Sequence, residues 1–426
     1  MRRKGAPAIV RESREVKRVF DPIHRFIALD DAEVALLDTA PVQRLRRLRQ
    51  LGLAYLAFPA AEHSRFGHAL GALAIGERIL TALRTNSGDY FGSETEFAAQ
   101  RRLLRASLLL HDVGHGPFSH ACEAVLGMHH ELRTAAILES AEVRTALARL
   151  EVEPADVLAL VAGDPAGRYP VLRELVSGPN LDADRMDYLL RDSYFTGAVG
   201  GSYDVEQLIG SLRIFETGGT LALGVDARGV VALESFIVAR YMMFATVYFH
   251  HTTRQFERIL QTALRETWPD ARALDPIEAF LAWDDFRVLE SFRFSTGKAA
   301  RAVRDREKLY ARVAEFNAAN DLATFERCLA RLTERYGDAV WADAQEQLMH
   351  RMPLGGRSTV LVNTHAGLID AREASDLINR VTGKAYWRKL YVERERVDVA
   401  EARDLCRSVS ADVSLKLFGA MSFQKS

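Results

Sequence analysis

The sequence predicts a mostly α-helical protein, in which a helical bundle with a small β-hairpin precedes a smaller α+β C-terminal subdomain. Long stretches place apolar residues at helical spacing, and one internal stretch has the β-rich arms and turn residues of a hairpin. After about residue 290 the chain changes to charged helical segments and strand-like runs. We therefore expect two domains, 1–290 and 291–426.

Apolar periodicity predicts the helices of the first domain. Residues 32–52 should form two short helices, of which the second opens near Pro41 and closes at Gly52. The stretch 64–84 carries two apolar stripes, so a helix there should be buried on two sides. Further helices are expected at residues 94–112, 125–140, 180–195 and 236–264.

The β-structure is expected in three places. Residues 219–236 have two β-rich arms around Asp226-Ala-Arg-Gly229, which predicts a hairpin. Residues 300–320 are typical of a charged helix, whereas 385–397 and 411–423 are typical of strands. The second domain is therefore expected to be mixed, with a role in oligomerisation or as a lid.

Composition limits the class of protein. The 56 basic and 57 acidic residues nearly cancel, so bulk charge gives no argument for a nucleic-acid or membrane partner, although a local basic patch stays open. The basic N-terminus lacks the apolar region of a secretory signal, and we find no stretch of roughly 18 apolar residues that would span a membrane. Three isolated cysteines favour a reduced, cytoplasmic protein: Cys122, Cys328 and Cys406.

The stretch HDVGHGPFSH, residues 111–120, is the strongest chemical motif. It holds three of the 12 histidines and directly follows the apolar RASLLL. His111 and Asp112 at a helix end can converge on one ion, and the break at Gly116-Pro117 leaves space beside that ion. Imidazole and carboxylate ligands suit Fe, Mn, Ni or Zn, and Mg less well. With open positions, such a site activates water and polarises a phosphoryl oxygen.

Two more residues are candidates to complete a metal site. His68 lies on a buried stripe of its expected helix. Asp184 shares one polar helix face with Arg185, Tyr188 and Asp192, because these four fall within roughly 100° on a helical wheel. The alternatives are a hydrogen-bonded core histidine and a solvated helix face.

The order His68, His111-Asp112, Asp184 resembles the H…HD…D signature of the HD-domain metal-dependent phosphohydrolases. More narrowly, the chain resembles the sterile-alpha-motif/HD-domain dNTP triphosphohydrolases and their bacterial, dGTPase-like relatives, in the stretches DPIHRFIAL, PAAEHSRFGHALG, LLHDVGHGPFSH and LDADRMDYLLRDSYFTG. The similarity runs from about residue 16 to 210 and more weakly to about 265, which makes 16–265 the motif-bearing core. The sequence shows no sterile-alpha-motif domain.

The resemblance implies a divalent metal ion (Mn, Fe, Mg, Ni or Zn) on His68, His111, Asp112 and Asp184. It also implies a triphosphate subsite, in which imidazoles donate to phosphoryl oxygens or move a proton and an arginine contacts phosphate. The residues at those positions are His115, His120, His130 and Arg65, with Glu123 and Glu131 placed to orient the histidines.

The resemblance further implies a sugar subsite and a regulatory site. The positions matching substrate contacts are Gln50, Leu51, Tyr188, Asp192, Arg240 and Tyr248. Tyr and Asp there read the 3′-hydroxyl in the relatives and exclude a 2′-hydroxyl. Phe249 stands where the relatives carry a base-proximal Gln, and His250-His251 replaces the usual His-Lys, so base preference is open.

The regulatory site of the relatives binds a guanine nucleotide at a subunit interface. Here Lys17, Asp38, Gln43 and Arg46 stand at its positions, with chemistry suited to a guanine edge and to phosphates. The alternative is that QRLRRLRQ is only a basic helix face.

These expectations define a leading hypothesis, a dNTP triphosphohydrolase that acts on a dNTP, forms a homo-oligomer and responds to a guanine nucleotide. One alternative is another HD phosphohydrolase, such as a nucleotide phosphatase or phosphodiesterase. The other is a nucleotide-sensing or nucleic-acid-binding protein with slow turnover. The joint presence of Arg65, Tyr188 and Asp192 with the histidine cluster favours the first.

Overall fold

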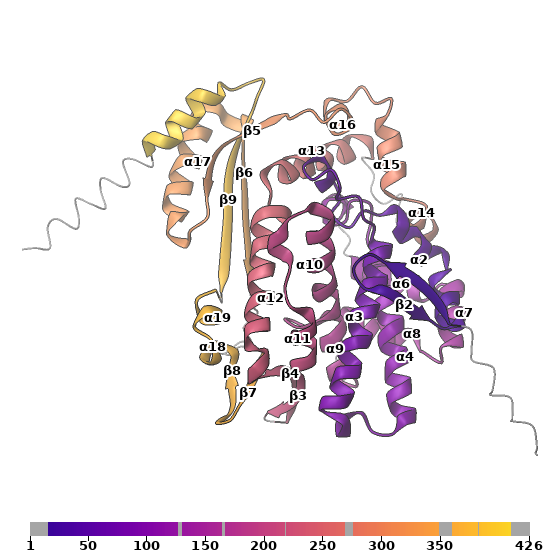
Figure 1. Ribbon diagram of the computed structural model, residues 1–426. Coiled ribbons are helices and arrows are strands. Elements are labelled where there is room, and N and C mark those ends of the chain that lie inside the picture. Colours follow the sequence, from indigo (N-terminus) through magenta and orange to yellow (C-terminus); the bar gives the residue numbers. More distant parts are fainter. Residues whose placement is uncertain are drawn as a thin grey trace, which may run out of the picture.

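The computed structural model has a helical bundle with a mixed C-terminal part beside it (Figure 1). The structure describes residues 16–126, 130–163, 167–217, 219–268, 276–348, 360–381 and 383–409. The mostly helical class, with a small hairpin and an α+β C-terminal region, is confirmed. The expected boundary at residue 290 falls inside α15 (Asp285–Phe292) and stays a prediction.

Three helices form the centre of the bundle: α3 (Arg65–Asn86), α4 (Glu94–Leu110) and α10 (Ala183–Thr196). As predicted, α3 is buried on two sides, because it packs against both α4 and α10. Glycines permit the close approach. A Cβ atom on Gly71 would lie 2.0 Å from Oδ1 of Asp187 on α10, and one on Gly76 would lie 2.2 Å from Leu108 Cδ1 on α4.

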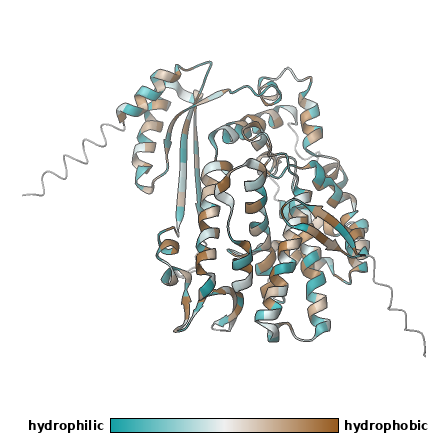
Figure 2. Ribbon diagram, in the orientation of Figure 1, coloured by the Kyte–Doolittle hydropathy of each residue, from teal (hydrophilic) through white to brown (hydrophobic). Residues whose placement is uncertain are grey.

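Further helices surround this centre, and hydrophobic and hydrophilic residues alternate along the helices of the bundle (Figure 2). They are α1 (Asp31–Leu37), α2 (Ala40–Arg44), α5 (His120–Leu126), α6 (His130–Leu138), α7 (Ala141–Arg149), α8 (Pro154–Ala162), α9 (Pro170–Ser177), α11 (Val205–Ser211), α12 (Val230–Met243), α13 (His251–Thr267), α14 (Ile277–Leu281) and α16 (Lys298–Arg304). The second helix predicted in 32–52 is shorter than expected. It ends at Arg44, before a 3-10 turn at Leu45–Arg47, and does not reach Gly52.

The strands form three sheets in the described residues. The N-terminal hairpin pairs β1 (Lys17–Asp21) with β2 (Arg25–Leu29). A four-stranded sheet has the order β3 (Leu212–Thr217), β4 (Thr220–Asp226), β7 (Leu361–Thr364) and β8 (Gly367–Asp370). An antiparallel sheet has the order β5 (Tyr310–Phe316), β9 (Lys384–Glu393) and β6 (Val340–Leu348). The other C-terminal helices are α17 (Leu322–Tyr336), α18 (Ala371–Ala374), α19 (Asp376–Val381) and a helix at 399–409.

Two local expectations are wrong. The hairpin has its arms at β3 and β4, so Asp226–Gly229 is not its turn but leads into α12. A helix forms after Gly229 because Leu233, Phe236 and Ile237 have helical spacing and bury one face of it. The helix predicted at 300–320 ends at Arg304, and β5 follows because it pairs with β9. The strand predicted at 385–397 is confirmed as far as Glu393, and 411–423 lies outside the described residues.

One helix contradicts the expectation that no stretch is apolar enough to span a membrane. Residues Ala227–Tyr248 meet that test by length and composition, and 44% of the apolar window is buried inside the fold. This helix packs into the bundle core through Leu233, Phe236 and Ile237. Its last five residues, Phe244–Tyr248, form a π-helical turn between α12 and α13.

Candidate active site

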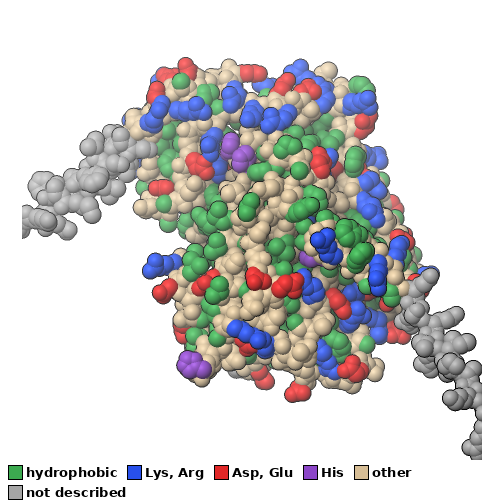
Figure 3. Space-filling view, viewed as in Figure 1, with side chains coloured by type: hydrophobic (Ala, Val, Ile, Leu, Met, Phe, Trp, Pro, Cys, Tyr) green, Lys and Arg blue, Asp and Glu red, His purple; other side chains and the backbone are tan. Residues whose placement is uncertain are grey.

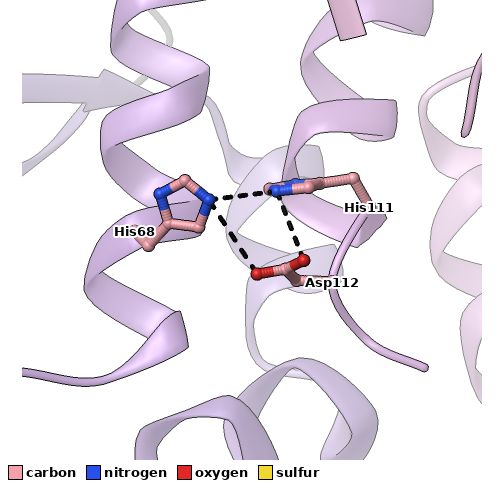
Figure 4. A group of neighbouring side chains, drawn as sticks. All are labelled: His68, His111 and Asp112. Carbon is pink, nitrogen blue, oxygen red and sulfur yellow. Dashed lines mark hydrogen bonds and ion pairs between the residues drawn. The ribbon is translucent and has the colours of Figure 1, made fainter. Parts of the chain in front are cut away.

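Four predicted metal ligands converge from three helices. His68 lies on α3, His111 caps the C-terminal end of α4 with Asp112 next to it, and Asp184 lies in the first turn of α10. Nε2 of His68 is 3.2 Å from Nε2 of His111 and 2.8 Å from Oδ1 of Asp184. Nε2 of His111 is 3.6 Å from Oδ1 of Asp112, and Figure 4 shows the side chains of His68, His111 and Asp112 pointing at one another.

The two imidazoles are held in the orientation that a metal ion requires. Nδ1 of His111 lies 2.7 Å from the carbonyl oxygen of Leu108, and Nδ1 of His68 lies 2.7 Å from Oδ2 of Asp187. Both acceptors take an Nδ1 proton, so both Nε2 atoms are left for the common centre. Two nitrogens and neighbouring carboxylates fit a divalent ion. The side chain of Asp184 is 35% exposed and lines the cavity. The centre is therefore open to the cavity on the side of Asp184.

Charge at the centre also favours a cation. Burial lowers the pKa of His68, but hydrogen bonds to Asp184 and Asp187 outweigh it and raise the pKa to about 10. Burial opposes ionisation of Asp112, yet Arg65 and His111 hold its pKa well below the usual range. The site therefore keeps ionised carboxylates next to imidazoles that attract a proton, and a metal ion can take that proton's place.

Asp187 is a buried residue that the sequence patterns did not single out. Its carboxylate contacts His68, accepts from Nε and Nη2 of Arg191 at 2.9 and 3.0 Å, and lies 2.6 Å from Nε2 of His24. Arg191 in turn donates to Asp21 at 2.8 Å. The N-terminal hairpin and α10 are thereby joined behind the candidate metal ligand His68. The sequence contained one signal for this contact, because an Asp and an Arg four residues apart on a helix can form an ion pair.

The sharp turn predicted after Asp112 positions an arginine. Phe118 and Ser119 adopt left-handed backbone angles, with φ of 52° and 54°, and such outliers concentrate at functional sites. Arg65 donates to Ser119 Oγ at 2.6 Å through Nη2 and to Asp112 Oδ2 at 2.5 Å through Nη1. Its guanidinium thus lies at the edge of the metal cluster, on the cavity wall. Ser119 is a further residue that the sequence patterns did not indicate.

Two predicted histidines and a glutamate form a second cluster. The rings of His115 and His130 stack with centroids 4.2 Å apart and planes 15° apart. Oε1 of Glu123 lies 2.9 Å from Nδ1 of His130 and 3.4 Å from Nδ1 of His115. The ligand atoms of these three side chains lie within 4.8 Å of one another, so the cluster could hold a metal ion as well as exchange hydrogen bonds with a substrate. Burial and the nearby Arg65 lower the pKa of His115.

The side chain of His120 lies outside the described residues, although its backbone begins α5. Glu131 is exposed on α6 and lines the cavity.

A cavity of about 590 Å³ joins these clusters to the predicted sugar contacts. Its volume is in the usual range for small-molecule sites. Arg240 is buried on α12 but is not part of the lining. The predicted residues that line the cavity are Gln50, Leu51, Arg65, His111, Asp112, His115, His130, Glu131, Asp184, Tyr188, Asp192 and Tyr248.

Asp192 organises one wall of the cavity. Its Oδ1 lies 2.7 Å from Nε2 of His63, and its Oδ2 accepts from the hydroxyl of Tyr248 at 2.8 Å. The rings of Tyr188 and Tyr248 meet edge to face with centroids 6.1 Å apart. Burial, with Asp192 next to it, keeps the pKa of Tyr248 well above its usual value, so this hydroxyl remains a donor.

The C-terminal sheet supports another wall. Phe249 lines the cavity, and its ring lies 5.0 Å from that of Trp387 on β9. Arg254 of α13 also lines the cavity, and its Nη2 donates to Asp343 of β6 at 2.9 Å. The sequence did not place this sheet against the site.

The predicted regulatory residues lie at the protein surface, away from the cavity lining. Lys17, Asp38 and Arg46 are exposed, and Nε of Arg46 donates to Oε1 of Gln43 at 2.8 Å. The guanidinium of Arg46 covers the ring of Phe66, 3.5 Å from its centroid. Their regulatory role stays a prediction.

Between Gln43 and Arg46, the side chain of Arg44 is buried and reaches the turn that follows Asp112. Nε and Nη2 donate to the carbonyl of Trp283 at 3.0 and 2.8 Å, and Nη1 donates to the carbonyl of His115 at 2.9 Å. Burial lowers the pKa of Arg44 to about 10. This side chain therefore anchors the backbone of a cavity residue.

Comparison with known proteins agrees with this geometry. A family model described as HD domain matches residues 65–166, and one described as HD associated region matches 203–336. The chain is 40% identical over 253 residues to uncharacterized protein YwfO of Bacillus subtilis, covering 58% of this chain and 55% of that protein. It is 25% identical over 341 residues to deoxynucleoside triphosphate triphosphohydrolase SAMHD1 of Danio rerio, covering 68% and 54%.

A crystal structure of a hypothetical protein from Aquifex aeolicus is 30% identical, with a TM-score of 0.78 over 92% of this chain and 100% of that one. The chain spans little more than half the length of the curated relatives it matches, 59% and 55% in two examples. The chain belongs to the HD-domain phosphohydrolase superfamily. HD-domain proteins depend on a divalent metal ion, and the His68, His111 and Asp112 cluster fits one.

Proposed function

We propose that the protein is a metal-dependent dNTP triphosphohydrolase, which converts a dNTP and water to a deoxynucleoside and inorganic triphosphate. One observation carries the proposal: a single cavity joins the metal cluster, Arg65 and His115 to the Asp192–Tyr248 wall. A substrate with phosphates at one end and a sugar hydroxyl at the other matches that arrangement.

The reaction is a displacement at the α-phosphorus. The oxygen of water bonds to phosphorus, the bond from phosphorus to the sugar 5′-oxygen breaks, and that oxygen leaves with a proton. A divalent ion on His68, His111, Asp112 and Asp184 would polarise a phosphoryl oxygen and favour ionisation of water.

The chain's own residues supply the remaining electrostatics. The Arg65 guanidinium, held by Asp112 and Ser119, donates to phosphoryl oxygens whose charge rises in the transition state. The lowered pKa of His115 keeps its ring neutral near neutral pH, so it can accept a proton and pass it to the leaving 5′-oxygen. Stacked against it, His130 is oriented by Glu123. His120 stays a candidate for the same subsite.

Asp192 and its neighbours would select the sugar. A carboxylate offers about four acceptor positions, so Asp192 can accept from a 3′-hydroxyl while bound to His63 and Tyr248. The rings of Tyr188 and Tyr248 fill the adjacent space and would exclude a 2′-hydroxyl. Gln50, Leu51 and Arg240 are further candidate contacts.

We also propose a cytoplasmic homo-oligomer that responds to a guanine nucleotide at Lys17, Asp38, Gln43 and Arg46. Surface exposure of Lys17, Asp38 and Arg46 supports the regulatory site, and three buried free cysteines support a reducing compartment. Basic and acidic side chains are interspersed on the face in Figure 3, which gives no argument for a nucleic-acid partner there.

The test is turnover of each dNTP and NTP with Mn, Fe, Mg, Ni or Zn, alone and in mixtures, with product identification. Triphosphate and deoxynucleoside are expected, and Asp112→Ala should reduce turnover at least 1,000-fold while circular dichroism stays unchanged. Release of orthophosphate or a nucleoside monophosphate would instead define another HD phosphohydrolase. Nucleotide binding without turnover would define a sensor, and unchanged activity of Asp112→Ala would exclude the metal mechanism.

A further inference from the structure

His63 connects two predicted sugar contacts through separate atoms. Its side chain meets Asp192, with 2.7 Å between Nε2 and Oδ1. Its backbone carbonyl accepts from the N–H of Gln50 at 2.9 Å. Residues 48–50 and 63–65 therefore lie side by side in a fixed register. Arg49 and Ser64 form an antiparallel β-bridge, and the N–H of Arg65 donates to the carbonyl of Leu48.

Among the described residues, the ring of His63 makes one polar contact and one stacking contact. It is 8% exposed and stacks on Phe195, with centroids 4.6 Å apart and planes 12° apart. Within the described part of the chain, Nδ1 makes no hydrogen bond, so Nε2–H directed at Asp192 is the ring's polar interaction. The ring is therefore fixed in its plane by Phe195 and aimed along that plane at one oxygen.

This contact limits how the Asp192 carboxylate can turn. The terminal torsion of an aspartate is broad and roughly two-fold, so an unrestrained carboxylate rotates easily. Donors on different oxygens, His63 on Oδ1 and Tyr248 on Oδ2, define a single orientation. The remaining acceptor positions then have fixed directions, which a hydroxyl acceptor needs if it is to discriminate between sugars.

We propose that His63 is a positioning residue that sets sugar selection by orienting Asp192. This inference rests on the proposed function. His63 does not touch the metal cluster in the described residues, so its loss should affect discrimination between deoxyribose and ribose more than the phosphate chemistry.

Two substitutions separate the donor from the stacking ring. His63→Phe keeps a ring against Phe195 and removes the donor, whereas His63→Gln keeps an N–H donor and removes the ring. With each dNTP and its matching NTP, His63→Phe should raise the KM for dNTPs about tenfold and lower the dNTP/NTP ratio of kcat/KM about tenfold. The kcat for dNTPs should stay within about threefold, and His63→Gln should retain most of the selectivity.

A double-mutant cycle tests whether His63 acts through Asp192. Adding His63→Phe to Asp192→Asn should change selectivity by less than twofold beyond Asp192→Asn alone, because the contact is already altered. Melting curves establish that each variant is folded. If His63→Phe does not fold, the comparison of His63→Gln with His63→Leu takes its place.

Several outcomes would overturn the inference. Unchanged selectivity in folded His63→Phe is one, and a fall in kcat that is equal for all substrates at constant KM is another. If the wild type turns over no nucleotide, the proposed function fails by itself. Equilibrium binding of each dNTP against its NTP then tests His63, and an identical affinity ratio in wild type and His63→Phe would reject its role.

Discussion

Nδ1 of His68 lies 2.7 Å from Oδ2 of Asp187, in the seam where Gly71 lets α3 and α10 approach. A carboxylate that accepts from a metal-binding imidazole fixes the ring's tautomer and raises its basicity. We expect Asp187→Asn to weaken binding of Mn²⁺ about 10- to 100-fold, measured by titration calorimetry on metal-free protein.

Asp192→Asn on the same helix is the matched control, because Asp192 bonds to His63 and Tyr248 and not to a metal ligand. Equal metal affinity in Asp187→Asn and wild type would show that Asp187 has only a packing role.

Phe249 lines the cavity, and Trp387 supports it from behind, with ring centroids 5.0 Å apart. A phenyl ring stacks on a base but cannot read its edge, whereas an amide can. We therefore expect wild type to vary little among the four dNTPs, and Phe249→Gln to spread their kcat/KM values by about threefold to tenfold. A strong base preference in wild type, unchanged by Phe249→Gln, would contradict this assignment.

Arg44 donates to two backbone carbonyls with three N–H groups, and one of those carbonyls belongs to His115. Lys at this position keeps the charge but cannot reproduce the planar fork. Arg44→Lys should lower the free energy of unfolding by about 2–4 kcal/mol, because it leaves buried carbonyls unpaired. Denaturant titration measures this, and Arg18→Lys, at an exposed position of β1, should change stability by less than about 0.5 kcal/mol.

Acid should destabilise the start of α13. Burial, followed by His250 and Arg312, lowers the pKa of His251 to about 4, and burial also lowers the pKa of His250. Nδ1 of His250 accepts the N–H of Thr252 at 3.3 Å, which requires the neutral ring. A pKa below the unfolded value of about 6.5 means that the stabilisation is complete above pH 6.5 and is lost as the pH falls toward 4.

Between pH 7 and 4, the Tm of wild type should therefore fall by about 2–4 °C more than that of His251→Gln, after discounting for partial exposure. His365→Gln, in the exposed turn between β7 and β8, is the control. Parallel Tm curves for wild type and His251→Gln would reject this contribution.

The sequence predicted the geometry of the candidate site correctly where a local feature of the chain places the side chains. An apolar helix that ends in His111-Asp112 before a glycine-proline break can be recognised without a structure, and its ligand atoms do converge. The two-sided burial of α3 followed from its apolar stripes in the same way.

The features that the sequence did not predict depend on contacts between segments that are distant along the chain. Nothing near Asp192 indicates that His63 bonds to it, and nothing near Phe249 indicates a tryptophan on β9. Secondary structure was mispredicted at 300–320 for the same reason. Its alanines and arginines favour a helix, but pairing with β9 stabilises a strand that begins at Tyr310.

The π-helical turn at Phe244–Tyr248, at the end of α12, determines the direction in which Tyr248 points. A π turn holds one more residue than an α turn, so deleting one residue there would restore a regular helix. Each residue corresponds to about 100° of rotation, and Tyr248 would then face away from Asp192. The register of the chain through this turn, and not its composition alone, decides which side chain meets the proposed sugar subsite.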